Sequence, residues 1–546
     1  MRTSDLATTR SRHPGPAPEL PSRRLVAGAL AALLVSLLGP VPSAQAAGLP
    51  GFASSSDEAA DFVGDWRGSL SVGGNELNIV FHIESGDDDG DLTATMDSPD
   101  QGARGIPVAS VEVRGDSLRL DIRAASAVYV GRMVGDGEII EGEWRQGGTR
   151  LPLTVKRGQE GGSDDREEME EPRRPQEPEP PHPYGTESVR IDVPGFDVTL
   201  AGTLTIPPGE PYAPAVVLAS GSGPQDRDGT VAGHRLFLVL ADHLTRRGVA
   251  VLRFDDPGVG GSTGSYFDST LEDRAAEVLA AVRLLRERSG IDPDRIGVLG
   301  HSEGGWVASL AAARAPEAIA FAVLMAGPAQ NPTELLLTQQ RAMLAARGAG
   351  EKEIAARDAF LAGNLDIIRA SPDAATARAR LLARRTRILE ELPHDERAAL
   401  EAYLAGQSDA ERDRLLWIAG TSWFRHLLAF DAGGLLRTMD QPALALFGAR
   451  DLQVPAKENA PFMERLLNAE RRTDRAVRVL PGLNHLFQPA ETGLPAEYGR
   501  IATTLAPAAL EAVSGWIARV IGDNSASGGP RGRSSDHGVA RPPFFD

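Results

Sequence analysis

The sequence predicts two folded units of different class, a small antiparallel β unit followed by a larger α/β unit with a mostly parallel sheet. Residues 62–157 alternate apolar and polar side chains in short runs separated by Gly-rich turns, which is typical of antiparallel strands. Residues 184–521 instead alternate short apolar runs with longer segments of helical spacing. That pattern indicates a sheet with helices on both faces. A chain of 546 residues is also too long for one ordinary domain.

The β unit, residues 62–157, is expected to form an antiparallel sandwich or a small barrel. His82 lies in its second run, and we interpret it as an ordinary strand residue rather than a ligand. No cluster of carboxylates or histidines stands out in this unit, so we expect an accessory domain and infer no activity for it. The expected strands are 64–72, 77–83, 108–113, 117–123, 128–134, 139–144 and 151–155.

The first 46 residues have the features of a secretory signal. Arg23 and Arg24 precede an apolar run over 25–38, and the small residues Ala44 and Ala46 suit a cleavage site. The run is shorter than the roughly 20 residues that a membrane-spanning helix needs. We therefore expect cleavage after Ala46, export to the periplasm or the medium, and no stable membrane insertion. The paired arginines also resemble a twin-arginine signal, so the export route stays open.

Composition excludes several classes of function. The net charge is −18, whereas a protein that binds nucleic acid needs a basic face. Part of this charge comes from residues 158–183, a Pro-rich stretch with nine acidic residues against three arginines, which predicts an extended linker. The chain has no cysteine, so disulfides, Cys-based zinc sites and a thiol nucleophile are excluded. Residues 522–546 are rich in Gly, Ser, Arg and Pro and are expected to form a disordered tail.

Ser302 is the candidate nucleophile. Residues 300–304, GHSEG, match the pattern G-x-S-x-G, with an apolar strand predicted directly before them and a helix directly after them. A serine at such a strand-to-helix turn is held exposed, and the flanking glycines let neighbouring backbone approach closely. A second match around Ser262 lacks the adjoining strand and helix, and we interpret it as a Gly-rich loop.

His485 is the candidate base, because a serine hydroxyl needs a group that takes its proton. It follows the last predicted strand, 476–480, and strand ends are where a mostly parallel sheet places its site. Three other histidines follow the predicted helix after Ser302, but His394 and His426 fall in a helical insertion and His537 falls in the tail.

Asp451 is the candidate acid, because it follows the predicted strand 443–447. A carboxylate at this point would fix the tautomer of the imidazole and stabilise the imidazolium that forms during attack. Asp440 is the rival, but it precedes the same strand and would lie at its other end.

An oxyanion hole needs backbone N–H donors. The first expected donor is Glu303, directly after the nucleophile, and the second comes from the loop over 220–228. Pro224 has no N–H, so Ser222 is the preferred second donor and Gly223 is the next.

At these residues the chain resembles the α/β-hydrolase superfamily, and within it bacterial exported esterases that carry a serine aminopeptidase-like hydrolase domain. The resemblance spans about 184–521. The N-terminal β unit also resembles the extra domain that such proteins often carry. Pro257 is a departure, because relatives more often have arginine there. The resemblance implies activity mainly on short acyl esters, and in some relatives on peptides. The matching segments are SGSGPQDRD (220–228), RFDDPGVG (253–260), GHSEGG (300–305) and GLNH (482–485).

Residues 328–440 interrupt the predicted sheet with a stretch of helical periodicity, which predicts a cap over the strand ends. Such a cap would shape the substrate pocket and exclude water. Trp423, Phe424 and Arg425 either contact the substrate or pack the cap onto the body of the domain.

We therefore expect an exported serine hydrolase that needs no metal or organic cofactor. The preferred activity is a carboxylesterase that cleaves small acyl esters through an acyl-enzyme. The first alternative is an aminopeptidase or acyl-peptide hydrolase, which needs acidic residues near the pocket to hold an amino terminus, and Glu303 is a candidate for that role. A remoter alternative is a non-catalytic protein that binds the cell envelope or carbohydrate.

Overall fold

The computed structural model describes residues 61–158 and 174–527, with short gaps. The expected signal, residues 1–46, lies outside the described residues, and so does the expected tail beyond residue 527. Among the helices of the described part, none is long and apolar enough to cross a membrane. The gaps are residues 73–74, 87–91, 99–102, 109, 123–126, 136, 147–148, 210, 408 and 469–470.

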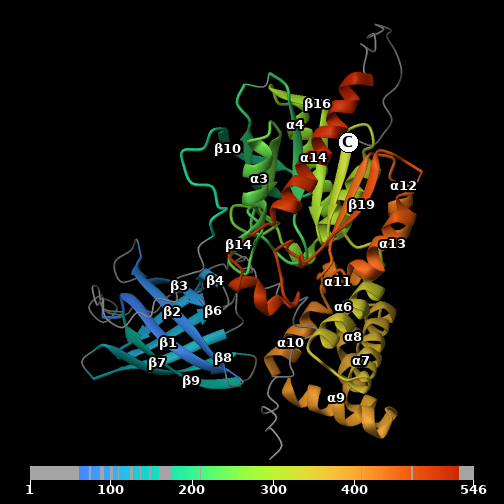
Figure 1. The fold of residues 1–546 in the computed structure, drawn as a ribbon. Helices are drawn as coiled ribbons and strands as arrows, with labels where there is room; N and C mark the ends of the chain where they lie inside the picture. The colour runs from blue at the N-terminus through green and yellow to red at the C-terminus, as the bar shows by residue number, and fades with distance from the viewer. Residues whose placement is uncertain are drawn as a thin grey trace, which may run out of the picture.

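The N-terminal unit is one antiparallel sheet in the order β4-β3-β2-β1-β9-β8-β7-β6-β5 (Figure 1). Since β3 also contacts β5, the sheet curls back toward a barrel. Trp66, Phe81 and Tyr129 are fully buried inside it. The antiparallel class is confirmed, and β3 and β4 are strands that the sequence analysis did not predict. The strands are β1 Gly64–Val72, β2 Asn75–Ser85, β3 Leu92–Ser98, β4 Ala103–Pro107, β5 Ser110–Arg114, β6 Ser117–Ile122, β7 Ala127–Val134, β8 Ile139–Gln146 and β9 Thr149–Arg157.

The second unit contains an eight-stranded sheet in the order β10-β11-β15-β12-β16-β17-β18-β19. From β15 to β19 every neighbouring pair is parallel, and β10 and β11 add an antiparallel edge. The predicted α/β class with a mostly parallel sheet is confirmed. The strands are β10 Gly185–Asp192, β11 Thr199–Ile206, β12 Ala213–Ala219, β15 Ala250–Phe254, β16 Ile291–His301, β17 Phe321–Met325, β18 Ala443–Gly448 and β19 Arg475–Leu480, and a small hairpin pairs β13 Thr230–Val231 with β14 His234–Arg235.

Helices cover both faces of this sheet (Figure 1), because side chains along each strand alternate between two apolar cores. In β12, Val216 and Leu218 join the core that contains residues of α3 and α14, whereas Ala215 and Val217 join the core that contains residues of α4, α5 and α13. This alternation explains why β12 is apolar throughout. The helices are α3 Leu236–Thr245, α4 Leu271–Arg286, α5 Glu303–Arg314, α13 Ala456–Leu466 and α14 Pro507–Ser527, with short 3-10 turns η3 Tyr266–Asp268 and η4 Pro495–Arg500.

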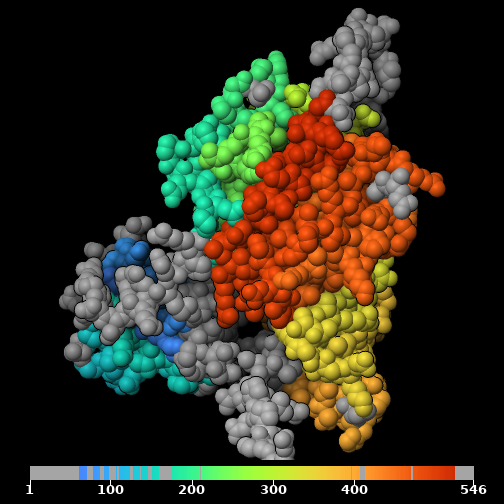
Figure 2. Space-filling model, viewed as in Figure 1, coloured from blue at the N-terminus to red at the C-terminus, as the bar shows by residue number. Residues whose placement is uncertain are grey.

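The insertion between β17 and β18 is entirely helical, as its periodicity predicts. Figures 1 and 2 show most of it, α6 to α10, in yellow and orange, as a lobe at one end of the sheet, whereas α12 lies beside the sheet against α5 and α13. Helices α9 and α12 were not predicted from the sequence. The helices are α6 Pro332–Ala346, α7 Glu351–Ala370, α8 Ala374–Glu391, α9 His394–Gly406, α10 Asp409–Ile418, α11 Ser422–Leu427 and α12 Ala432–Thr438.

Two expectations at the boundaries of this unit need correction. The second half of the expected linker is bonded to the folded domain: Arg174 donates to the carbonyl oxygens of Ile501 and Gly499, and Gln176 donates to that of Leu505. Backbone carbonyls supply these partners, so composition could not reveal them. Helix α14 also continues to Ser527, past the expected start of the tail at residue 522.

Candidate active site

Ser302 lies at a sharp turn between β16 and α5, with φ 56° and ψ −123°. A non-glycine residue rarely adopts a positive φ, and such strain is concentrated at functional turns. The two glycines of the motif are required by contact: a Cβ on Gly300 would lie 1.8 Å from the carbonyl oxygen of Gly304, and one on Gly304 would lie 2.2 Å from that of Ala219. The G-x-S-x-G pattern therefore reflects backbone that passes too close for any side chain.

His485 and Asp451 are brought together from the loops after β19 and β18. The imidazole Nδ1 of His485 lies 2.8 Å from Oδ2 of Asp451, and both residues are 3% exposed. The other carboxylate oxygen of Asp451 accepts hydrogen bonds from the backbone N–H groups of Gln453 and Val454, each at 2.8 Å. The carboxylate is thus fixed from both sides. The side chain of Asp440, the rival acid, is 91% exposed.

The loop that carries His485 is fixed by its neighbours. The side-chain oxygen of Asn484 accepts from the backbone N–H groups of Leu486 and Gln488, at 3.0 and 2.9 Å. His301 supports the same loop, since its Nε2 lies 3.0 Å from the carbonyl oxygen of His485. Burial, reinforced by nearby His485, lowers the pKa of His301 to about 3. His301 is therefore neutral near pH 7 and donates this hydrogen bond. Sequence reasoning gave His301 no role.

Ser302 and His485 line one small cavity, of about 40 Å³, at the carboxyl ends of the parallel strands. Ser222 and Glu303, the preferred oxyanion donors, line it too. These four residues follow three different strands in the sequence, β12, β16 and β19, and meet at one point, as a mostly parallel sheet predicts. In the described part of the chain, no group of three or more His, Asp or Glu side chains is placed to hold a metal ion.

The second oxyanion candidate, Gly223, is already engaged. Its N–H donates to the hydroxyl of Tyr266 at 2.8 Å. Ser222, one residue earlier, contacts the turn of the nucleophile, because its hydroxyl donates to Glu303 at 2.9 Å. The side chains of the two preferred donors are therefore bonded to each other.

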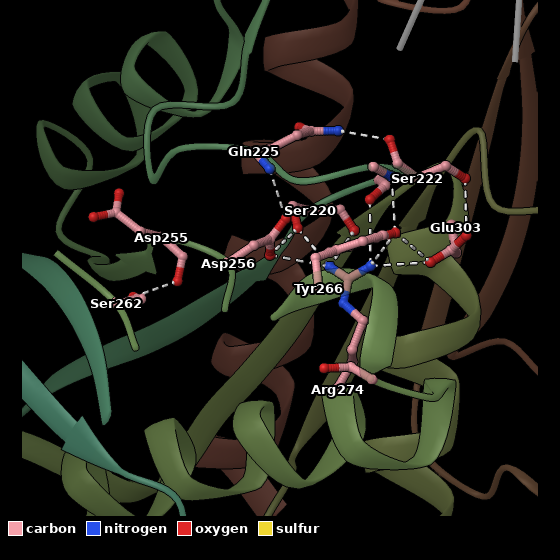
Figure 3. Close-up of polar contacts among 12 residues, drawn as sticks. Ser220, Ser222, Gln225, Asp255, Asp256, Ser262, Tyr266, Arg274 and Glu303 are labelled. Carbon is pink, nitrogen blue, oxygen red and sulfur yellow. Dashed lines mark hydrogen bonds and ion pairs between the residues drawn. The ribbon is translucent and has the colours of Figure 1, made fainter. Parts of the chain in front are cut away.

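The carboxylate of Glu303 is the centre of a buried network (Figure 3). It accepts hydrogen bonds from the hydroxyl of Tyr266 and the guanidinium of Arg274, each at 3.0 Å, in addition to Ser222. Arg274 also pairs with Asp256 at 3.1 Å, and both are almost fully buried. A buried charge is tolerated when it is paired and hydrogen-bonded, and Glu303 meets both conditions. This network was not predicted from the sequence, because its members come from separate elements.

The three proposed cap contacts have different surroundings. The indole N–H of Trp423 lies 3.1 and 3.2 Å from the two carboxylate oxygens of Glu303. Phe424 lines a cavity inside the cap, not the cavity at Ser302. Arg425 donates to the carbonyl oxygen of Ser371 at 2.6 Å. Trp423 and Arg425 thus pack the cap, which was one of the two alternatives.

The rejected candidates lie elsewhere. The hydroxyl of Ser262 donates to the carbonyl oxygen of Asp255 at 2.8 Å and accepts from the N–H of Ala201 at 2.9 Å, so this serine holds a loop. His394 begins α9, and His426 in α11 bonds to the carbonyl oxygen of Ser422. Neither histidine lines the cavity at Ser302. His537 lies outside the described residues.

Comparison with known proteins agrees with this fold. Residues 216–492, half of the chain, match the alpha/beta hydrolase family, and the chain therefore belongs to that family. The resemblance drawn from the sequence is confirmed. The chain is 29% identical over 304 residues to esterase EstD of Thermotoga maritima, which covers 55% of this chain and 61% of that protein.

Solved structures of similar fold include Est1E from Butyrivibrio proteoclasticus with bound ferulic acid. It is 18% identical, with 62% of this chain and 100% of that one covered and a TM-score of 0.35. Proline iminopeptidase from Mycobacterium smegmatis is also 18% identical over 62% of this chain and 100% of its own, with a TM-score of 0.36.

Proposed function

We propose that this protein is a serine hydrolase of carboxylic esters, with Ser302 as nucleophile, His485 as base and Asp451 as the group that orients the base. The observation that carries the proposal is the 2.8 Å contact between His485 and Asp451 beside a strained serine in the same cavity. Similarity to esterase EstD supports the ester as substrate. The chain spans about 61% of that relative, so the proposed activity rests on the geometry of the site.

In this mechanism His485 donates its Nδ1–H to Asp451, which leaves Nε2 free to take the hydroxyl proton of Ser302. The serine oxygen attacks the ester carbonyl carbon, and a tetrahedral oxyanion forms. Collapse of that intermediate breaks the bond to the alcohol, which leaves with the proton from His485. Water then attacks the carbonyl carbon of the acyl-enzyme while His485 takes its proton. His485 returns a proton to the serine oxygen as the acyl bond breaks, which releases the acid and restores Ser302.

The N–H groups of Glu303 and Ser222 stabilise the oxyanion in this proposal. The N–H of Gly223 is a poor choice because it already donates to Tyr266. Glu303 follows the nucleophile at the start of α5, where the helix N-terminus also favours negative charge. Loss of one such donor typically costs about 100- to 1000-fold in rate.

The surroundings of Glu303 favour an esterase over an aminopeptidase. Among the described residues that line the cavity, Glu303 is the sole carboxylate. It is therefore the group there that could hold a substrate ammonium group. Its charge is already balanced by Arg274 and bonded to Ser222, Tyr266 and Trp423. An amino terminus would have to displace these buried partners at high cost.

The test compares kcat/KM for p-nitrophenyl acetate and butanoate with that for leucine p-nitroanilide. We expect the esters to be cleaved and the anilide to be cleaved far more slowly, with Ser302→Ala inactive on all three. Faster cleavage of the anilide would contradict the ester assignment, and unchanged activity in Ser302→Ala would contradict the nucleophile.

We also propose that the protein is exported. Support comes from Arg23 and Arg24 before a short apolar run and from small residues up to Ala46. Expression in a bacterial host followed by cell fractionation and N-terminal sequencing tests this. We expect periplasmic protein that begins at Ala47, and cytoplasmic protein that retains Met1 would contradict export.

A further inference from the structure

The cap contains a second cavity, of about 120 Å³, that is separate from the one at Ser302. Its described lining residues all fall between Leu336 and Phe424, so the helical insertion alone builds it. The walls are mostly aliphatic and aromatic, including Leu361, Leu365 and Phe360. A mostly apolar cavity of this kind suits an apolar ligand group.

Gln339 in α6 lies at the junction of the two cavities, because it lines both of them. Its neighbours Leu335 and Leu336 line one each. Gln339 is 3% exposed, and its side-chain Nε2 has no hydrogen-bond partner among the described residues. A buried donor left without an acceptor is costly, so this amide is poised for an acceptor that a ligand brings.

We propose that the cap cavity binds the acyl chain of the substrate, and that Gln339 donates to an oxygen carried by that chain near its carbonyl. The substrate class is therefore esters of medium-length acids with an oxygen substituent, of which a 3-hydroxyalkanoate is the simplest example. This inference rests on the proposed ester hydrolysis and adds the identity of the acyl group.

The cavity volumes set the length of the chain. An apolar cavity of about 150 Å³ takes one benzene, so a cavity of about 120 Å³ holds roughly five or six carbons. The cavity at Ser302, of about 40 Å³, takes the carbonyl group and one or two further carbons. Together they fit an acid of about eight carbons, with its third carbon near Gln339.

The position of the cap cavity assigns it to the acyl group rather than to the alcohol. None of its described lining residues belongs to the loops that carry His485 and Asp451. The alcohol leaves toward His485, which protonates it. The cap cavity instead shares its wall residue Gln339 with the cavity at Ser302. Its wall residue Phe424 also directly follows Trp423, whose indole bonds to the side chain of Glu303, the residue that supplies a proposed oxyanion donor.

The first test measures kcat/KM for p-nitrophenyl acetate and octanoate in the full-length protein and in Ala419→Phe, which adds a ring to a wall residue of the cap cavity alone. We expect octanoate to fall by about 10-fold or more and acetate to change less than about threefold. Ala375→Phe, on the exposed surface of α8, is the matched control and should leave both unchanged. Equal losses on both esters, or no loss on octanoate, would overturn the proposal.

The second test compares p-nitrophenyl 3-hydroxyoctanoate with octanoate. A site that hydrogen-bonds a substrate hydroxyl discriminates against the analogue that lacks it, so we expect the native protein to favour the hydroxylated ester by about 10-fold. Gln339→Leu should remove that preference by raising the rate on octanoate relative to the hydroxylated ester. A native preference that survives in Gln339→Leu, or no native preference, would contradict the role of Gln339.

A binding measurement separates this inference from the proposed function. Calorimetry on Ser302→Ala with free 3-hydroxyoctanoate needs no catalysis. We expect binding that Ser302→Ala/Ala419→Phe weakens by about 10-fold or more. If the native protein cleaved no ester while this binding persisted, the proposed function would fail and the acyl site would stand. Absent or unaltered binding would refute the acyl site itself.

Discussion

The indole N–H of Trp423 lies 3.1 and 3.2 Å from the two carboxylate oxygens of Glu303. Trp423 belongs to α11 of the cap, whereas Glu303 directly follows Ser302 and begins α5. One buried carboxylate therefore joins the cap to the turn that presents the candidate nucleophile. Hydrogen bonds to a charged group are the stronger kind, so this contact fixes the cap over the site.

Trp423→Phe should destabilise the protein because it removes the indole N–H that donates to the buried carboxylate of Glu303. We expect the free energy of unfolding to fall by about 1.5–3 kcal/mol beyond the effect of lost volume. Urea unfolding, followed by circular dichroism, measures this change.

Trp516→Phe is the matched control. Trp516 is 1% exposed, and its indole Nε1 has no hydrogen-bond partner among the described residues, so the same substitution there removes volume alone. Equal losses in the two variants would mean that the bond from Trp423 to Glu303 contributes nothing.

Gly304→Ala should abolish activity, because its Cβ would lie 2.2 Å from the carbonyl oxygen of Ala219 and the turn at Ser302 would have to move. We expect hydrolysis of p-nitrophenyl butanoate to fall by about 100-fold or more. Gly515→Ala in α14 is the control, since nothing lies within 4 Å of the added Cβ. That variant should keep full activity and gain up to about 1 kcal/mol of stability. An active Gly304→Ala enzyme would show that the close approach is not required.

Asp451→Asn should lower kcat by about 10,000-fold with a small effect on KM, because the neutral amide no longer fixes the productive tautomer of His485. Asp440→Asn serves as the control at the rival position, whose side chain is 91% exposed, and it should behave as the native protein. Steady-state kinetics with p-nitrophenyl butanoate distinguishes them. A loss in Asp440→Asn comparable to that in Asp451→Asn would reverse the assignment of the acid.

His234 should make stability depend on pH. Its imidazole bonds to Thr504 and to the carbonyl oxygen of Tyr498, at 2.9 and 3.0 Å, and burial lowers its pKa to about 4. The unfolded chain binds a proton near pH 6.5, whereas the folded protein does so only near pH 4. The stability that the neutral, buried His234 gives the folded protein is therefore complete above pH 6.5 and is lost as the pH falls toward 4.

Urea unfolding at about pH 7.5 and pH 5 measures this effect. Over that interval His234 should cost the native protein about 2 kcal/mol, and His234→Gln should lack this part of the decline. The same decline in both proteins would show that His234 does not titrate as its burial implies.

The sequence predicted the fold class because two periodicities, of 2 and of 3.6 residues, are visible along the chain. It predicted where Ser302, Asp451 and His485 should lie because each follows a parallel strand, and such strand ends share one edge of the sheet. The structure places His485 beside Asp451 and in one cavity with Ser302. Their catalytic roles remain proposals that the tests above address.

Other features depend on tertiary contacts that no local pattern reveals. Arg274, Tyr266 and Trp423 meet Glu303 from three separate elements, so periodicity along any one element could not pair them. Strand β10 was missed because only Val189 and Ile191 of its eight residues are buried, and its first four residues are all exposed. The cap cavity arises between helices whose packing the sequence does not specify.

The most direct test of the central claim is labelling with a fluorophosphonate, which reacts with an activated serine hydroxyl. Digestion and mass spectrometry then locate the label. We predict one label per chain on Ser302, none in Ser302→Ala, normal labelling in Ser262→Ala and much slower labelling in His485→Ala. Absence of label from the native protein, or label on Ser262 that persists in Ser302→Ala, would contradict the assignment of Ser302 as the nucleophile.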